Sequence, residues 1–125
     1  MDQTRRLLIV DDEETLTFSL YQSFILAKQN YEVVTASSGE EALEKIKEKP
    51  FDLVISDISM PGMSGLDLLS LIKQINPQTK VIIMTAYGSD EKREEAIDKG
   101  AVGYIEKPFE IREVKQMVLN ALTQV

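Results

Sequence analysis

Short runs of apolar, mostly β-branched residues recur along the chain, and each run ends abruptly in polar or turn-forming residues. Runs of this length and composition predict buried β-strands. They occupy residues 7–10, 31–36, 53–57, 81–84 and 101–105. The longer segments between them carry apolar residues every three or four positions, which predicts amphipathic helices. Strands and helices are therefore expected to alternate strictly.

The helix boundaries are predicted from capping and terminating residues. Asn30 lies where the first helix should stop, because asparagine tolerates the left-handed conformation that many helix ends need. The other signals are the capping pair Ser38 with Glu41, a further helix start at Ser64 and Asp67, and the terminator Gly100. The predicted inward stripes include Leu16, Leu20, Phe24 and Ala27 in the first helix, and Leu68, Leu69, Ile72 and Ile75 in the third.

Alternation of helices with continuously apolar strands predicts a parallel sheet that is covered on both faces. Right-handed crossovers leave few topologies for such a chain. We therefore expect an α/β fold with one doubly wound, five-stranded parallel sheet. A length of 125 residues suits one domain with a substantial core, so residues 1–125 are expected to form a single domain.

Composition narrows the chemistry. The chain has no Cys and no His, which excludes disulfides and thiolate sites and nearly excludes a zinc site or a His-based proton relay. A net charge of −7 argues against direct binding of nucleic acid and permits divalent cations or a basic protein surface. The apolar stretch after Arg6 is too short for a signal peptide or a membrane span. The cytoplasm is the expected compartment, with no membrane partner.

Polar residues directly follow four of the predicted strands. They are Asp11 and Asp12 after the first strand, Asp57 at the end of the third, Thr85 after the fourth and Lys107 after the fifth. The carboxyl ends of parallel strands meet at one edge of a sheet, so these side chains should converge. Three carboxylates would repel each other there, and Mg²⁺ would resolve the conflict. The ammonium and hydroxyl groups complete a cradle for a phosphoryl group.

A phosphoryl group needs an acceptor. With neither His nor Cys in the chain, the candidate nucleophile is a carboxylate, which would give an aspartyl phosphate. Asp57 is the best candidate, because it is single, ends a strand and faces both the acid pair and Lys107. A strand-terminal Asp taken alone is more often a helix cap or a turn former. The convergence of four strand ends favours the chemical interpretation.

These motifs resemble the receiver domain of two-component response regulators over almost the whole chain. The matching blocks are residues 8–12, 52–57 with 60–65, 83–86, and 100–101 with 104–109. Several separate blocks in the family's order form a far stronger signal than any one of them. The resemblance implies a flavodoxin-like fold with the sheet order 2-1-3-4-5, which is the order known for this family.

The resemblance also implies a role for each site residue. Asp57 would be phosphorylated by a histidine kinase, a phosphotransfer protein or a small acyl-phosphate donor. Asp12 and Asp57 would bind Mg²⁺ directly, together with the backbone carbonyl of Ser59, whereas Asp11 would act through a metal-bound water. Lys107 would pair with the phosphoryl group, and its bond to the following proline would be cis.

A conformational switch is implied as well. Thr85 would turn its hydroxyl toward the phosphoryl group, and Tyr104 would swing inward into the vacated space. This would repack the surface formed by residues 89–99, 101–105 and 110–122, which partners read and through which two copies could form a homodimer. From the residues alone, a fixed core position for Tyr104 stays open.

Some positions refine the resemblance. Ser59 and Tyr87 occupy positions that tune the phosphoryl lifetime in the family. Residues 85–88 and 107–110 look most like receivers of enhancer-binding transcription activators and of phosphorelay proteins. The chain could therefore be the N-terminal domain of a transcription regulator or a single-domain regulator.

The alternatives to a phosphorylation switch are an interaction module and two classes of enzyme. A receiver-like interaction module that needs no phosphate is the main alternative, and the intact set of acids, Thr85 and Lys107 argues against it. A flavin or nucleotide enzyme would need a phosphate-binding loop, but neither GxxxxGK[ST] nor GxGxxG occurs. A haloacid-dehalogenase-like phosphatase would need a second acid where Ser59 stands. We therefore expect a phosphorylation switch rather than an enzyme acting on other substrates.

Overall fold

The computed structural model describes residues 4–123, and its strands and helices alternate as predicted. The predicted single domain, residues 1–125, extends at both ends beyond the described residues. The elements are β1 (Arg5–Val10), α1 (Glu14–Ile25), β2 (Tyr31–Ala36), α2 (Gly39–Glu48), β3 (Leu53–Asp57), α3 (Gly65–Ile75), β4 (Lys80–Thr85), α4 (Asp90–Asp98), β5 (Gly103–Glu106) and α5 (Ile111–Thr123).

The strands form one parallel sheet in the order β2-β1-β3-β4-β5. The register aligns the carboxyl ends of neighbouring strands. Asp57 pairs with Met84, and Thr85 pairs with Glu106. The predicted α/β fold, with a doubly wound sheet of five parallel strands in this order, is therefore confirmed.

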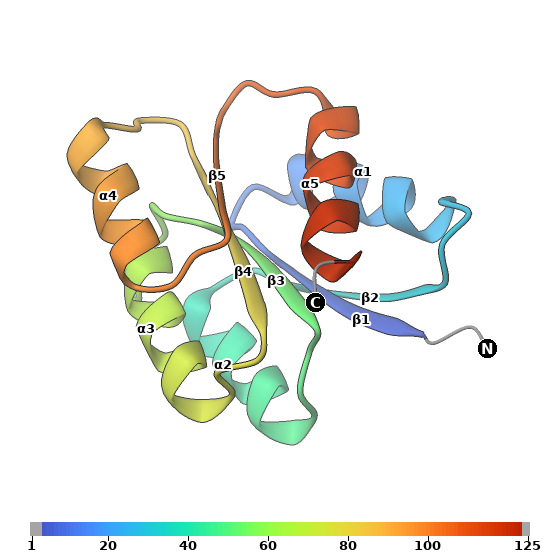
Figure 1. Cartoon of the computed structure of the whole chain (residues 1–125), viewed down its shortest axis with the longest axis horizontal. Coiled ribbons are helices and arrows are strands. Elements are labelled where there is room, and N and C mark those ends of the chain that lie inside the picture. The colour runs from blue at the N-terminus through green and yellow to red at the C-terminus, as the bar shows by residue number, and fades with distance from the viewer. Residues whose placement is uncertain (1–3, 124–125) are drawn as a thin grey trace.

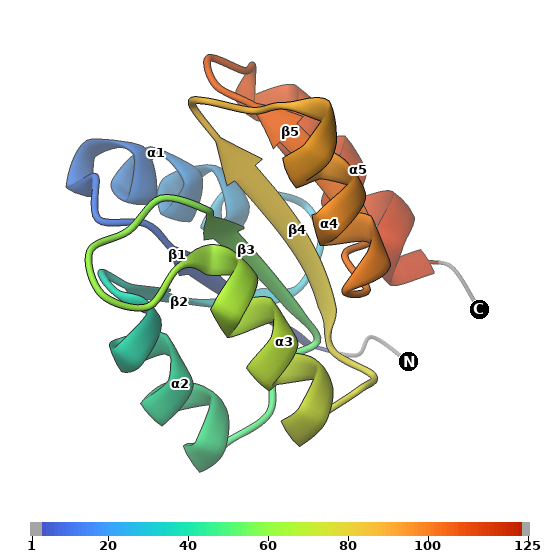
Figure 2. The same ribbon diagram turned by 90° about the vertical axis from the view of Figure 1, so that its left-hand side faces the viewer.

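Helices cover both faces of the sheet (Figure 1). Helices α1 and α5 lie on one face of the sheet, and α2, α3 and α4 lie on the other. In Figure 2 the face that carries α2, α3 and α4 is turned toward the viewer. Successive residues of a strand point to opposite faces. In β1, for example, Leu8 and Val10 enter the core under α2, α3 and α4, whereas Leu7 and Ile9 enter the core under α1 and α5. This two-sided burial explains why the strands are continuously apolar.

Three helices begin at a serine whose side chain accepts a hydrogen bond from the N–H group three residues later. These serines are Ser38, Ser64 and Ser89. The predicted capping pair at α2 is half correct. The Glu41 side chain accepts a hydrogen bond from the N–H of Ser37, at 2.6 Å, rather than from that of Ser38. The cap therefore reaches one residue further back than the standard capping box.

The first helix ends earlier than predicted. It stops at Ile25, so Ala27 lies outside it, and no non-glycine residue within 4–123 has a positive φ. The left-handed conformation predicted for Asn30 is therefore wrong. Its carbonyl instead accepts a hydrogen bond from the N–H of Arg5, at 3.0 Å, which extends the pairing of β1 with β2 backwards by one residue. Asn30 therefore leads into a strand rather than ending a helix.

Two further boundaries differ from the sequence pattern. Ile75, at the end of α3, is 44% exposed, because the last turn of that helix runs past the edge of the core. Strand β5 begins at Gly103, two residues later than predicted, because the N–H of Ala101 still bonds to the carbonyl of Ala96 in α4. Gly100 ends α4 as predicted, with a φ of 107° that favours glycine. Within residues 4–123, no helix has the length and apolar character that a membrane crossing requires.

Candidate phosphoryl-acceptor site

The strand ends bring the predicted site residues to one edge of the sheet. Asp57 is the last residue of β3 and Thr85 the last of β4, and both side chains are buried. Asp11 follows β1, and Lys107 follows β5. The N–H of Asp11 bonds to the carbonyl of Ala36, and the N–H of Lys107 bonds to the carbonyl of Thr85. Sheet-like hydrogen bonding thus continues through the residues that carry these side chains, which restricts their positions.

The ammonium group of Lys107 lies between two buried carboxylates. Its Nζ is 2.8 Å from Oδ2 of Asp11 and 3.4 Å from Oδ1 of Asp57. The Lys107 side chain is 17% exposed, so solvent reaches it only in part. The shorter contact identifies Asp11 as the main partner, and it holds the ammonium within reach of Asp57.

Three carboxylates gather at this point. One oxygen from each of Asp11, Asp12 and Asp57 lies within 4.8 Å of the others. Asp11 and Asp57 are buried, whereas Asp12 is exposed on the solvent side. Carboxylate oxygens of this kind, with one open side, suit a hard cation such as Mg²⁺, which keeps part of its water shell. The predicted acidic cluster is therefore present.

The electrostatics of the site follow from burial and crowding. Burial raises the pKa of Asp57, and the charges of Asp11 and Asp12 raise it further, against the lowering effect of Lys107. For Lys107, burial alone would lower the pKa, but the hydrogen bond to Asp11 and the charges of Asp11 and Asp57 outweigh it and raise the pKa. The site thus holds an ionised lysine among an excess of negative charge, which a bound cation would relieve.

Thr85 and Tyr104, the predicted switch pair, lie on neighbouring strands. The Thr85 hydroxyl oxygen accepts a hydrogen bond from the N–H of Tyr87, at 3.2 Å, within the turn that follows β4. The Tyr104 hydroxyl is buried and has no hydrogen-bond partner among residues 4–123. Burial raises the pKa of this hydroxyl. Both side chains contact the space around Gly88.

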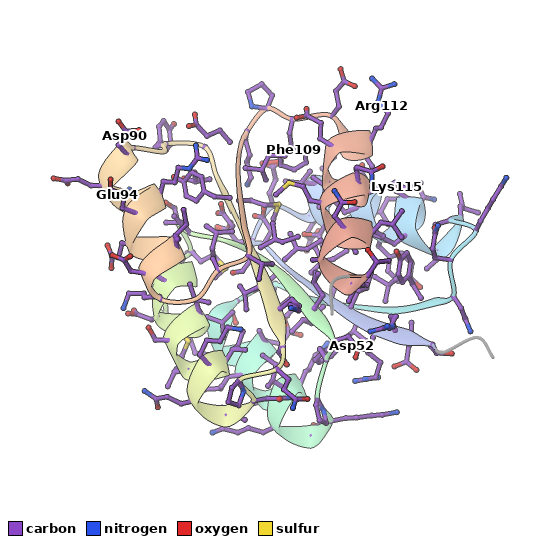
Figure 3. All side chains as sticks on the ribbon, in the orientation of Figure 1. Asp52, Asp90, Glu94, Phe109, Arg112 and Lys115 are labelled. Atoms are coloured by element: carbon purple, nitrogen blue, oxygen red, sulfur yellow. The ribbon has the colours of Figure 1, made fainter. Side chains whose placement is uncertain are left out.

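The remaining predicted residues lie around this centre. Ser59 lies two residues beyond Asp57, exposed in the loop that leads to α3. The bond between Lys107 and Pro108 is cis, as the resemblance implied. Phe109 follows in the same loop, and Figure 3 shows it between β5 and the start of α5. Lys107, the first residue of this loop, therefore contacts the acidic cluster, and the residues after it lead into α5.

Two residues that support the site were not identified from the sequence. The Thr17 hydroxyl donates a hydrogen bond to the carbonyl of Glu13, at 3.0 Å, and holds the turn after Asp11. A Cβ on Gly65 would lie only 2.1 Å from the backbone oxygen of Asp57, so α3 can begin this close to the site only with glycine there. A threonine inside a helix carries no sequence signal for such a role. Gly65 lies in residues 60–65, one of the blocks that resemble the receiver family. Its position in the sequence does not show that the start of α3 lies against the backbone of Asp57.

Comparison with known sequences places the chain among signalling proteins. Residues 7–119 match the response regulator receiver domain family. The chain is 40% identical over 121 residues to the response regulator protein FleR of Pseudomonas aeruginosa. It is 39% identical over 118 residues to the sporulation initiation phosphotransferase F of Bacillus subtilis. These matches cover 96% and 94% of the chain, but 25% of FleR against 93% of phosphotransferase F.

Comparison with solved structures also identifies receiver domains as similar proteins. A receiver domain from Clostridium thermocellum aligns with a TM-score of 0.86 at 34% identity, covering 94% of each chain. The receiver domain of a Luxo repressor protein from Vibrio parahaemolyticus aligns with a TM-score of 0.89 at 32% identity, covering 96% of this chain and 91% of the other. Sequence family, relatives and fold thus point the same way. The chain belongs to the response regulator receiver domain family.

Proposed function

We propose that this receiver domain is the phospho-acceptor of a two-component pathway and that Asp57 takes the phosphoryl group. The observation that carries the proposal is the position of Asp57, a buried carboxylate at the end of β3, 3.4 Å from the ammonium of Lys107 and grouped with two further acids. The donor would be a histidine kinase or a phosphotransfer protein. The domain promotes its own phosphorylation and dephosphorylation and acts on no other substrate.

The proposed reaction transfers a phosphoryl group from a histidine nitrogen of the donor to a carboxylate oxygen of Asp57. A carboxylate oxygen of Asp57 forms a bond to phosphorus while the phosphorus–nitrogen bond of a phosphohistidine breaks, and the imidazole takes up a proton. Lys107 donates hydrogen bonds to the phosphoryl oxygens. Its 2.8 Å bond to Asp11 keeps the ammonium at the site before transfer. Preorganised charge of this kind is the main contribution a protein makes to phosphoryl transfer.

We propose that Asp12 and Asp57, with the backbone carbonyl of Ser59, would hold Mg²⁺ directly and that Asp11 would act through a bound water. Both oxygens of Asp11 already accept hydrogen bonds, one from Lys107 and one from the N–H of Glu13, which supports an indirect role. The raised pKa of Asp57 and the exposure of Asp12 fit a cation that enters from solvent. The Mg²⁺ ion would neutralise negative charge around the transferred group.

The proposed output is a change at the surface of α4, β5 and α5. Thr85 would turn its hydroxyl toward the phosphoryl group, and Tyr104 would report this to the surface. Three large apolar side chains are exposed around α4 and β5, namely Tyr87, Ile97 and Val102. These exposed side chains would contribute apolar contacts to a protein partner, including a second copy of the chain.

The whole protein's role is a separate question. FleR is about four times as long as this chain, whereas phosphotransferase F has nearly its length, and the two are about equally similar to it. We therefore propose both an N-terminal regulatory domain and a single-domain regulator as contexts for the same chemistry. Reading the full coding frame decides between them, and neither context requires this domain itself to bind nucleic acid.

Phosphate incorporation from a small donor tests the assignment. Incubation with acetyl phosphate or phosphoramidate and MgCl₂, followed by intact-protein mass spectrometry, should show one phosphoryl group on the wild type and none on Asp57→Asn. Asp52→Asn is the matched control, because Asp52 precedes the same strand at the opposite edge of the sheet from Phe109 (Figure 3). Equal labelling of Asp57→Asn and wild type would refute the assignment.

Thermal unfolding tests the metal site. MgCl₂ should raise the Tm of the wild type more than NaCl of equal ionic strength, because a ligand that binds only the folded state stabilises it. At tenfold excess over the dissociation constant, the expected gain is about 1.4 kcal/mol. Asp12→Asn should lose most of the gain, whereas Glu13→Gln, next to it but outside the cluster, should keep it. A full gain in Asp12→Asn would contradict the proposed ligand set.

A further inference from the structure

Tyr104 packs its hydroxyl against Gly88. A Cβ placed on Gly88 would lie 2.7 Å from the Tyr104 hydroxyl oxygen and 3.1 Å from the γ-methyl carbon of Thr85. A separation of 2.7 Å is below any ordinary contact between a carbon and an oxygen. The tyrosine hydroxyl and the threonine methyl therefore both border the space that a side chain at residue 88 would occupy.

The position of Tyr104, whose ring is partly buried, has one favourable and one unfavourable contribution. Its ring packs against the core under α3 and α4, which favours the position. Its hydroxyl is the one buried side-chain polar atom without a hydrogen-bond partner among residues 4–123, which opposes it. The Ser89 backbone lies close enough to influence the pKa of the hydroxyl, but without the geometry of a hydrogen bond. A side chain held by opposing contributions of this kind is sensitive to small changes in the space around its hydroxyl.

We infer that Gly88 is a positioning residue of the switch, because the space left by its missing side chain sets whether the Tyr104 ring lies inside the domain or outside it. This inference rests on the proposed function in giving Tyr104 a signalling role. The contacts of the ring around Gly88 can be measured without any phosphoryl donor. One methyl group at residue 88 should displace the hydroxyl and turn the ring toward solvent.

A double-mutant cycle tests this, with the protein in solution and no phosphoryl donor present. In the wild type, NMR should show nuclear Overhauser contacts between the Thr85 methyl group and the Tyr104 ring. In Gly88→Ala these contacts should disappear, and the ring should become accessible to solvent. In Gly88→Ala/Tyr104→Phe the contacts with the ring at position 104 should return, because the clash is with the hydroxyl oxygen. Tyr104→Phe alone should keep them and leave the Tm unchanged or raised.

Gly103→Ala is the matched control on the strand that carries Tyr104. Its new methyl group would meet first the flexible end of Met117, so the contacts between positions 85 and 104 should persist. Persistence of the contacts in Gly88→Ala, or their absence from the double variant, would overturn the inference, and so would their loss in Gly103→Ala. The outcome is independent of phosphate labelling at Asp57. Failure of the ring measurement and failure of the proposed function are thus distinguishable.

Discussion

Asp11 and Lys107 are 96 residues apart in the sequence, yet the carboxylate of Asp11 accepts a 2.8 Å hydrogen bond from the ammonium group of Lys107. Asp11 is almost completely buried, with 1% of its surface exposed. The pair joins the loop after β1 to the loop after β5, across β3 and β4 in the sheet. It therefore connects the acidic cluster to the strand that carries Tyr104.

Lys107→Met should lower the free energy of unfolding at pH 7 by about 2 kcal/mol, since removing one partner leaves the buried carboxylate of Asp11 without its hydrogen-bond donor. Urea unfolding in the presence of a chelator measures the change. Arg112→Met is the matched control, because Arg112 pairs at 2.8 Å with Glu110 and both side chains are exposed. Exposed pairs contribute about 0–1 kcal/mol, so the control should change little. Equal stability losses in the two variants would contradict the distinction.

The stability of the domain should depend on pH through Asp57. Burial, followed by the charge of Asp11, raises the pKa of its carboxyl above the ordinary value of 3.8. The folded state therefore holds a proton at pH values where the unfolded chain has lost it, and stability falls as pH rises above 3.8 through the folded pKa. Asp57→Asn removes this penalty.

Urea unfolding over a pH series, in a chelating buffer, measures this effect. Wild type and Asp57→Asn should have similar stability below the ordinary pKa, and the variant should become the more stable of the two as pH rises. Asp52→Asn provides the comparison, since Asp52 accepts a hydrogen bond from the N–H of Arg6, far from the cluster. A stability difference between wild type and Asp57→Asn that shrinks with rising pH would show that the sign is wrong.

The sheet and the acidic cluster could be predicted because both follow from the order of apolar and polar residues along the chain. A run such as Leu53–Asp57 specifies a buried strand with a carboxylate at its end, and parallel strands must gather their ends at one edge. The cis bond before Pro108 came only from family resemblance, since no local pattern around Lys107 specifies it. Periodicity placed the strands and helices, and resemblance assigned chemical roles to the polar residues at the strand ends.

The errors came from features that depend on neighbours in space. Asn30 looked like a helix end, but the hydrogen bond that its carbonyl accepts from the N–H of Arg5 in β1 aligns it as the residue that leads into β2. The roles of Gly65 and Gly88 depend on how closely other segments approach them, which spacing does not reveal. The partner of the Lys107 ammonium was also unpredictable in detail. The sequence placed it near three acids without indicating that Asp11 is closer than Asp57.

Gly65→Ala should be strongly destabilising. The new methyl carbon would lie 2.1 Å from the backbone oxygen of Asp57 and 2.9 Å from the Cα of Ile58, so backbone atoms must move. We expect a loss of about 3 kcal/mol in the free energy of unfolding and weaker Mg²⁺ binding, because the shift displaces Asp57. Gly39→Ala is the control, since its methyl meets the side chain of Met63 at 3.0 Å. A stability loss smaller than that of Gly39→Ala would show that the backbone around residue 65 accommodates a side chain.

Helix α4 should be the least protected helix on its face of the sheet. One of its side chains, Ala96, is buried, whereas α3 buries Gly65, Leu68, Leu69 and Ile72. The side chains of Asp90 and Glu94 point away from the sheet (Figure 3). A helix of 9 residues has little stability of its own and depends on such packing. Amide hydrogens in its middle turn should therefore exchange through local opening.

Hydrogen exchange followed by NMR measures this difference. At pH 7, amides in the middle of α4 should exchange at least about tenfold faster than those in the middle of α3, because local opening of α4 exposes little apolar surface. Helix α2 is the comparison, since it is one residue longer than α4 while Ala42 and Ile46 anchor it in the core. Protection of α4 equal to that of α2 would mean that it opens only with the whole domain. Lower protection would leave α4 free to shift when the Tyr104 ring moves, without disturbing the strand that carries Asp57.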